Sequence, residues 1–278
     1  MKRILVVLGL IVSLSLVACG KETKETAIKK NEDIVKEEII KKEVDYKENF
    51  KGINGSAVFF TPEENMYNIY NKELSEKEIS PYSTFKILTS LMGLSKDVVK
   101  TPDTKLGYDG TIHWREQWNR DIPFKEAFRE SCVWYYEKIV DSLDKEYVQK
   151  ILNELDYGNK DISAWNENGH NTFWISSSLK ISAMEHVEVL SKIFEEKTSF
   201  EEKDIEMVKD FMLVKTEENY KVYGKTGSGS KKNSWFTGFF EKDEKKTYFA
   251  VVLDDDSKEV SGAIAKEIVF DIIARNFK

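Results

Sequence analysis

Strand-forming segments lie near both ends of residues 51–278, and most of the helix-forming segments lie between them. Apolar and alternating runs rich in aromatic and β-branched residues predict strands at Ser56–Phe60, Met66–Tyr70, Lys221–Lys225, Ser234–Phe240 and Thr247–Leu253. Longer amphipathic runs predict helices at Phe124–Leu143, Lys145–Leu155, Ser182–Phe194, Lys203–Val214 and Gly262–Phe277. The simplest arrangement is an α+β fold: one antiparallel sheet made from both chain ends and flanked by helices, with an inserted all-helical lobe. A binding site is expected where the two parts meet.

The N-terminal residues have the pattern of an export signal. Basic residues precede an apolar run, Ile4–Val17, that is too short to favour a lasting membrane span. The run ends in Leu16-Val17-Ala18-Cys19, which resembles the lipobox of bacterial lipoproteins, where Cys19 becomes the lipidated N-terminus. A secretory signal that merely contains a cysteine is the alternative.

We therefore expect three parts. Residues 1–19 form a lipoprotein signal peptide, residues 20–50 a Lys- and Glu-rich spacer, and residues 51–278 a folded domain. The mature protein is then exported and tethered by lipid to the outer face of a bacterial membrane.

Charge and residue usage exclude several classes. The formal net charge is −7 and basic residues do not cluster, so a nucleic-acid partner is not expected. Cys19 and Cys132 are the two cysteines, which predicts no disulfide framework. Asp254–Asp256 lacks the alternating ligands of a calcium loop. The histidines have no metal-ligand spacing, so no metal site is expected: His113, His170 and His186.

Ser83-Thr84-Phe85-Lys86 stands at the start of a predicted helix. The i,i+3 relation places Ser83 and Lys86 on one face, one turn apart. A serine hydroxyl is a poor nucleophile until a base takes its proton. Lys86 becomes such a base only if burial lowers its pKa. Taken alone, the pair also fits a helix N-cap followed by a solvated lysine.

Further short motifs follow in order along the chain. Each has an ordinary structural interpretation when taken alone, such as a helix cap, a C-terminal glycine turn or a pair of core aromatics. They are Ser131-x-Val133, Tyr157-Gly158-Asn159, Phe173-Trp174, Lys225-Thr226-Gly227 and Trp235-Phe236-Thr237-Gly238. With the Ser83–Lys86 pair, this ordered set resembles the class D (oxacillinase-type) serine β-lactamases from about Gly52 to Lys278, in the lipoprotein-like form of Gram-positive bacteria.

The resemblance implies a fold and an activity. The fold is that of serine β-lactamases and penicillin-binding transpeptidases, and the activity is hydrolysis of β-lactam antibiotics through a serine acyl-enzyme. Ser83 is the implied nucleophile. Lys86 is the implied general base, carrying an N6-carboxylate formed with CO2 or bicarbonate and needing no other cofactor. Trp174 is implied to donate its indole N–H to that carboxylate.

The remaining roles are also implied by the resemblance. Ser131 relays a proton to the departing nitrogen, and Lys225 holds Ser131. Val133 and Ile175 form apolar walls around the lysine. Thr226 and Ser228 contact the substrate, and the backbone N–H groups of Ser83 and Ser228 form the oxyanion hole. Tyr157-Gly158-Asn159 is expected to shape the loop under the site and to take no part in the chemistry.

One departure concerns the substrate carboxylate. Many class D enzymes place an arginine just after the last strand, whereas the stretch Asp254–Gly262 has none and Arg275 lies far into the last helix. The sequence leaves open whether the carboxylate is held by Lys225, Thr226 and Ser228 or by a lysine reaching back, Lys231 or Lys232.

Two other functions fit part of the pattern. A penicillin-binding DD-peptidase or a β-lactam sensor domain shares Ser83, Lys86 and Lys225 but deacylates slowly. A lipoprotein that only binds cell-wall material needs no reactive serine. The oligomeric state is not predicted.

Overall fold

A computed structural model gives the fold. It describes residues 39–167, 169–229 and 232–277. The predicted signal peptide with Cys19, most of the predicted spacer, and Lys231 lie outside the described residues. The chain divides into two units, and all the described residues belong to the second, Glu37–Lys278.

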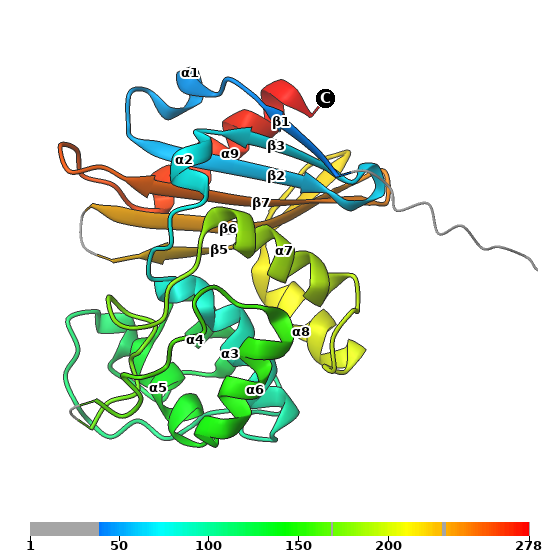
Figure 1. Cartoon of the computed structure of the whole chain (residues 1–278). Coiled ribbons are helices and arrows are strands. Elements are labelled where there is room, and N and C mark those ends of the chain that lie inside the picture. The colour runs from blue at the N-terminus through cyan, green and yellow to red at the C-terminus, as the bar shows by residue number, and fades with distance from the viewer. Residues whose placement is uncertain (1–38, 168, 230–231, 278) are drawn as a thin grey trace, which may run out of the picture. The chain divides into compact units, whose positions relative to one another are not determined.

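One sheet of seven strands, in the order β1-β3-β2-β7-β6-β5-β4, forms the centre of this unit. β1 runs parallel to β3 and every other neighbouring pair is antiparallel. The strands are β1 (Ile40–Glu43), β2 (Gly55–Thr61), β3 (Met66–Tyr70), β4 (Leu213–Thr216), β5 (Tyr220–Ser228), β6 (Asn233–Lys242) and β7 (Lys245–Asp254). Strands from the two chain ends thus pair directly at β2 and β7, as the sequence predicts (Figure 1).

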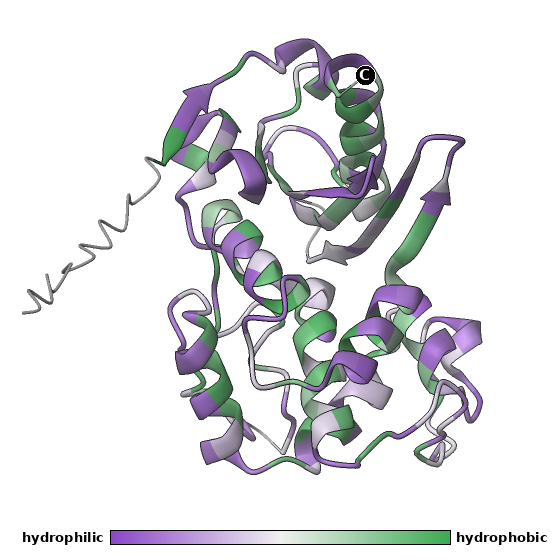
Figure 2. Cartoon of the chain, turned by 90° about the vertical axis from the view of Figure 1, so that its right-hand side faces the viewer, coloured by the Kyte–Doolittle hydropathy of each residue, from purple (hydrophilic) through white to green (hydrophobic). Residues whose placement is uncertain are grey.

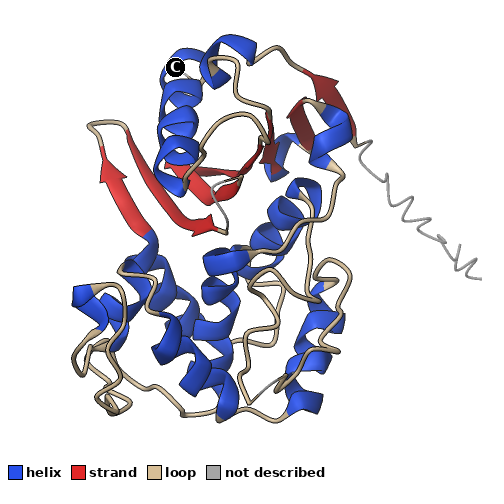
Figure 3. Cartoon of the chain, turned by 90° about the vertical axis from the view of Figure 1, so that its left-hand side faces the viewer, coloured by secondary structure: helices blue, strands red, loops and turns tan. Residues whose placement is uncertain are grey.

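Helices cover both faces of the sheet. The helices are α1 (Lys47–Phe50), α2 (Lys72–Ser75), α3 (Lys86–Ser95), α4 (Phe124–Arg129), α5 (Val133–Asp141), α6 (Lys145–Leu155), α7 (Ala183–Phe194), α8 (Glu202–Met212) and α9 (Gly262–Asn276). Helix α9 packs on β5, β6 and β7 from one side, and α7 packs on β2, β6 and β7 from the other. Most other helices gather in a separate lobe, as the colours of Figure 3 show.

Two hydrophobic cores result from the alternation of side chains along the strands. On β6, Trp235 belongs to the core shared with α7 and the helical lobe, whereas its neighbour Phe236 belongs to the core under α9. All seven residues of β2 are buried because this strand lies centrally and is covered on both faces. The helices of the lobe carry both apolar and hydrophilic residues along their length (Figure 2), as amphipathic helices do. The predicted α+β fold is confirmed.

Several boundaries differ from the sequence prediction, and three of them matter most. The folded unit begins before residue 51, because β1 pairs with β3 and Phe50 is buried. The predicted helix Phe124–Leu143 is two helices, separated at Ser131, whose φ of +54° interrupts the helical backbone. The end of the predicted helix Lys203–Val214 is the edge strand β4.

Candidate active site

Ser83 lies in a 3₁₀ turn, Tyr82–Phe85, that leads directly into α3. The first residue of α3 is Lys86, and its Nζ lies 3.1 Å from the Ser83 Oγ, within hydrogen-bond distance. The turn packs against β5, where a Cβ on Gly227 would stand 2.8 Å from the carbonyl oxygen of Pro81. Glycine at 227 therefore permits the close approach of the strand to the turn that carries Ser83.

Lys86 is buried, with 1% of its surface exposed. Burial lowers the pKa of Lys86 to about 7, with smaller opposing contributions from Cys132 and Glu137. Its Nζ also lies 5.1 Å from the centre of the Tyr136 ring. At neutral pH, Lys86 is therefore an uncharged amine in a large fraction of the molecules. In this form it can take a proton from Ser83 or react as a nucleophile.

Trp174 lies in the loop that precedes α7 and is fully buried. Its ring packs against those of Phe85 and Phe173, with centroids 5.8 Å and 5.3 Å away. Its carbonyl accepts a hydrogen bond from the Tyr82 N–H at 3.0 Å, which ties this loop to the turn carrying Ser83. The indole Nε1 is buried and has no partner within the described part of the chain. An orphaned buried donor is costly, so it points to an acceptor that completes the site.

Ser131 and Lys225 form the second polar pair. The Lys225 Nζ on β5 donates to the Ser131 Oγ, which lies in the break between α4 and α5. It also donates to the carbonyl of Thr226 at 3.1 Å. Burial holds the pKa of Lys225 well below its usual value, and the positive charges of Lys86 and Arg115 add to this. The left-handed backbone at Ser131 is uncommon for a residue with a side chain, and such backbone strain clusters at active sites.

These groups border one cavity of about 440 Å³. Its lining includes Ser83, Ser131, Val133, Ile175, Thr226 and Ser228, which the sequence singles out. Lys86, Lys225 and Trp174 stand behind the surface of the cavity, because each is at most 4% exposed. The Ser228 Oγ accepts a hydrogen bond from the Gly262 N–H at 3.0 Å, which ties β5 to the start of α9.

The cavity also has lining residues to which the sequence analysis gave no role. They are Tyr82, His113, Trp114, Arg115, Trp118, Trp134, Glu137 and Gly229. The sequence signal for a functional role was the presence of His113, Trp114, Arg115 and Trp118 within six positions. This segment has no regular periodicity, however, so the sequence does not predict that it folds over the site.

Tyr157-Gly158-Asn159 supports the loop that contains Trp174. The Asn159 side chain donates to the carbonyl of Ser178 at 2.9 Å and accepts from the Lys180 N–H at 3.0 Å. The Tyr157 ring is buried against Phe85, 5.5 Å between centroids. The triplet therefore lies behind the site and not in its cavity.

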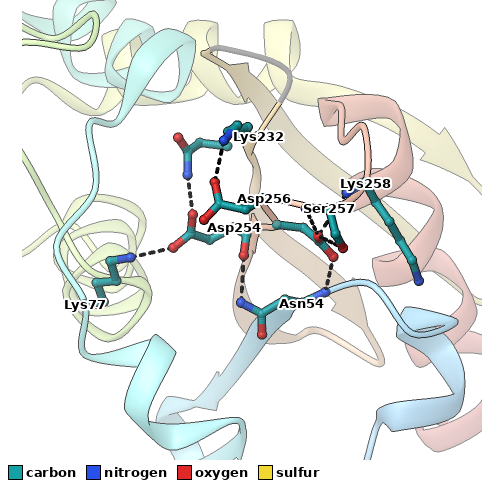
Figure 4. Close-up of polar contacts among 9 residues, drawn as sticks. Asn54, Lys77, Lys232, Asp254, Asp256, Ser257 and Lys258 are labelled. Carbon is teal, nitrogen blue, oxygen red and sulfur yellow. Dashed lines mark hydrogen bonds and ion pairs between the residues drawn. The ribbon is translucent and has the colours of Figure 1, made fainter.

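The turn after β7 offers no cation to the cavity. Lys232 pairs with Asp256 at 2.6 Å, and Lys77 pairs with Asp254 at the same distance (Figure 4). The Asp255 carboxylate accepts hydrogen bonds from Asn54, Ser257 and Lys258, which hold its pKa below the usual range. On α9, Arg275 bonds Asp271 at 2.8 Å.

The described ranges contain neither a cluster of metal-ligating side chains nor a membrane-spanning helix. No group of three or more His, Cys, Asp or Glu side chains within them is placed to hold a metal ion. Of the histidines, His186 is buried against Trp235, His170 pairs with Glu137 at 3.3 Å, and His113 lines the cavity. None of the helices described there is long and apolar enough to cross a membrane.

Fold and site together define a protein with a serine–lysine pair between a sheet and a helical lobe. The chain belongs to the Penicillin binding protein transpeptidase domain family, which matches residues 37–274. Within this family it is a class D β-lactamase-like protein.

Two groups of curated relatives support this assignment. The probable β-lactamase YbxI of Bacillus subtilis is 32% identical over 228 residues, covering 81% of this chain and 82% of YbxI. The methicillin resistance protein MecR1 of Staphylococcus aureus is 34% identical over 230 residues, covering 79% of this chain but 38% of MecR1. The chain therefore spans about two-fifths of the length of MecR1.

Solved structures show the same two likenesses. The class D β-lactamase of Bacillus subtilis superposes with a TM-score of 0.77 at 31% identity, covering 84% of this chain and 95% of that one. The C-terminal domain of the BlaR penicillin receptor of Bacillus licheniformis gives a TM-score of 0.77 at 28% identity, covering 84% and 96%. The relatives thus include both β-lactamases and a penicillin receptor.

Proposed function

We propose that this protein hydrolyses β-lactam antibiotics through an acyl-enzyme on Ser83. The observation that carries the proposal is the contact of Ser83 with a buried lysine of lowered pKa, at the edge of a cavity that is also lined by Ser131, the partner of Lys225. This brings a nucleophile, a base and a proton donor together around one space.

In the acylation step, the Ser83 Oγ attacks the β-lactam carbonyl while its proton passes to the base at Lys86. The oxyanion is assigned to the backbone N–H groups of Ser83 and Ser228, and each such donor contributes about 3–4 kcal/mol to acyl transfer. The ring C–N bond then breaks, and Ser131 gives its proton to the nitrogen. Lys225, bonded to the Ser131 Oγ, supplies the replacement proton. Before deacylation, the base at Lys86 gives up the proton that it took from Ser83, which restores the proton lost by the Lys225–Ser131 pair. It then takes a proton from water, which attacks the ester carbonyl; the bond from the acyl carbon to the Ser83 Oγ breaks, and the Oγ recovers the proton from the base.

Lys86 is also proposed to react with CO2, losing a proton and becoming an N6-carboxylate. The buried amine fits this reaction because a neutral lysine is needed, and the unpartnered Trp174 Nε1 fits as a donor to the added oxygens. When present, the carboxylate supplies an anionic proton acceptor for both half-reactions. It would also replace the positive charge of Lys86 that now lowers the pKa of Lys225, so Lys225 would hold its proton more firmly.

The test uses the Ser83→Ala variant and a chromogenic cephalosporin. Wild-type protein is expected to give many turnovers per molecule, and Ser83→Ala none while keeping its melting temperature. Mass spectrometry with a poor substrate should place one acyl group on the peptide that contains Ser83. An active Ser83→Ala protein, or an adduct on another residue, would contradict the assignment.

A β-lactam receptor is the second candidate, favoured by the likeness to the BlaR C-terminal domain and to MecR1. A receptor would be acylated on Ser83 and would release the product slowly. It would therefore show one burst of product per molecule in the same assay. A protein that only binds cell-wall material would give neither turnover nor an adduct.

The location is proposed from the sequence. Cys19 is the proposed lipid attachment site, which would hold the exported protein at the outer face of the cell membrane. Metabolic labelling with palmitate should mark the wild type and not Cys19→Ala. Release of unlabelled wild-type protein into the medium would contradict the anchor.

A further inference from the structure

The substrate of the proposed reaction brings a negative charge that the site must accommodate. Penicillins and cephalosporins carry a carboxylate beside the β-lactam ring. The turn after β7 cannot meet it, because its acidic residues already engage Lys77 and Lys232 (Figure 4). The turn itself carries three carboxylates, Asp254, Asp255 and Asp256, and none of its residues lines the cavity.

Arg115 is a cation that lines the cavity from the other side. It belongs to the segment that precedes the short 3₁₀ turn Glu116–Trp118, in the helical lobe. Its guanidinium carbon lies 4.7 Å from the centre of the Trp114 ring and 5.6 Å from that of Trp118. Cation–π contacts with two indoles restrict the movement of the guanidinium, which prepares it for a planar anion.

The Arg115 guanidinium has hydrogen-bonding capacity that the described residues do not use. Its Nε is buried without a hydrogen-bond partner among the described residues, and no described acidic side chain forms an ion pair with it. Two other described arginines, Arg120 and Arg275, do form ion pairs, and each bonds a carboxylate of the protein itself. A half-buried guanidinium with a free donor edge in a cavity is a receptor for a carboxylate.

The charge of Arg115 reaches the reacting groups. It is one of the causes that lower the pKa of Lys225, and the partner of Lys225, Ser131, lines the same cavity as Arg115. Burial also lowers the pKa of Lys86 and Lys225, whereas an arginine stays protonated at any working pH. Arg115 is therefore the dependable positive charge of this cavity.

We propose that Arg115 binds the carboxylate of the β-lactam substrate, from the helical lobe, and so determines which β-lactams are accepted. This rests on the proposed function. Thr226 and Ser228 lie on the facing strand and line the same cavity, so a carboxylate between the two lobes would have hydroxyl donors on one side and the guanidinium on the other.

The test compares a penicillin with its methyl ester, which has the same ring but no negative charge. For Arg115→Gln, the acylation rate constant divided by the dissociation constant should fall about 10- to 100-fold with the acid, as expected for one charged hydrogen bond. It should change less than about threefold with the ester. Arg115→Lys should restore part of the loss. Arg120→Gln, which removes an arginine of the same segment that pairs with Glu126 outside the cavity lining, is the matched control and should behave as wild type.

A second measurement does not depend on the ester. Added salt screens the attraction of a carboxylate, so acylation by the acid should slow with ionic strength in wild type and much less in Arg115→Gln. Equal losses on acid and ester, no loss on either, or an unchanged salt dependence would overturn the proposal. If the proposed function itself is wrong, the experiment gives a different result, because wild type then forms no adduct on Ser83 with either compound. Melting curves of each variant separate loss of binding from loss of fold.

Discussion

Two lysines, Lys86 and Lys225, are buried in the wall of one cavity, with 1% and 4% of their surfaces exposed. Burial disfavours the ammonium form of both, and the charge of one opposes the charge of the other. The state in which both lysines are protonated ammonium groups is therefore energetically unfavourable. This is the physical condition under which a lysine acts as a base instead of a surface cation.

The pH dependence of acylation follows from Lys86. Its pKa is lowered to about 7, so the amine holds a proton at lower pH and cannot accept one from Ser83. We expect the acylation rate to rise with pH through about 7 and to level off above it. Added bicarbonate should restore part of the lost rate near the midpoint, because it drives carboxylation of the neutral amine. The measurement is acylation by quenched-flow mass spectrometry, with carbon-13 bicarbonate and NMR to detect the added carbon.

Trp174→Phe provides the internal comparison for that experiment. It keeps an aromatic ring but removes the N–H, so it should weaken the carbon-13 signal and slow deacylation more than acylation. Trp165→Phe is the matched control, because Trp165 stacks on Phe173 in the same loop at 5.5 Å. Full turnover by CO2-depleted wild type, without any labelled carbon, would mean that Lys86 acts as a plain amine.

The residues that carry chemistry were predictable from the sequence where their motifs are short and local. Ser83 and Lys86 are three residues apart. Lys225, Thr226 and Ser228 lie within one stretch of four residues. Local geometry alone therefore brings the members of each group close together. Arg115 was not predictable. Its place in the cavity depends on how an irregular segment folds over the site, and no periodicity encodes that.

At the scale of the elements, the break at Ser131 has most influence on the site. Apolar residues continue at helical spacing from Phe124 to Val140, so the sequence predicts one uninterrupted helix. In the structure α4 ends at Arg129 and α5 begins at Val133, and the Ser131 hydroxyl between them meets Lys225. Hydrophobic periodicity cannot reveal the break because both helices bury the same face.

The loop carrying Trp174 depends on Gly158. This residue has a φ of +50°, and a Cβ on it would stand 1.9 Å from the carbonyl oxygen of Lys180. Gly158→Ala should therefore cost more than about 2 kcal/mol, from backbone strain together with displacement of the loop. Gly110→Ala is the matched control, since Gly110 has a φ of +88° but open space around its Cβ, and should cost about 1 kcal/mol.

Chemical denaturation of both variants measures the difference, and the turnover number shows whether the loop still supports the site. We expect deacylation to slow in Gly158→Ala and to stay normal in Gly110→Ala. Equal costs in the two variants would show that the contact with Lys180 is unimportant and that backbone conformation alone matters.

For the whole molecule, the joining of both chain ends in one sheet was predictable, because strongly apolar strands such as Val58–Phe60 and Phe249–Leu253 had to be buried. The two edge strands were not. β1 (Ile40–Glu43) is exposed along its length, and β4 (Leu213–Thr216) is only half-buried, so neither has the apolar pattern by which strands are recognised. Their pairing partners, and not their own composition, determine their structure.

The N-terminal end of the folded unit gives the last prediction. Phe50 and Tyr46 are buried at 1% and 5% exposure under the sheet, and the Asn49 side chain donates to Asp271 of α9 at 2.9 Å. A chain shortened to begin at Lys51 loses β1, α1 and both aromatic side chains, so its free energy of unfolding should fall by roughly 3–6 kcal/mol. A chain that begins at Glu37 keeps them all and should melt at the temperature of the full chain. None of the described residues before Lys51 lines the active-site cavity, so the chain that begins at Glu37 should also keep full turnover. Equal melting temperatures for the two would place the start of the folded unit at residue 51 after all, and would show that the contacts of Phe50 and Asn49 add nothing to stability.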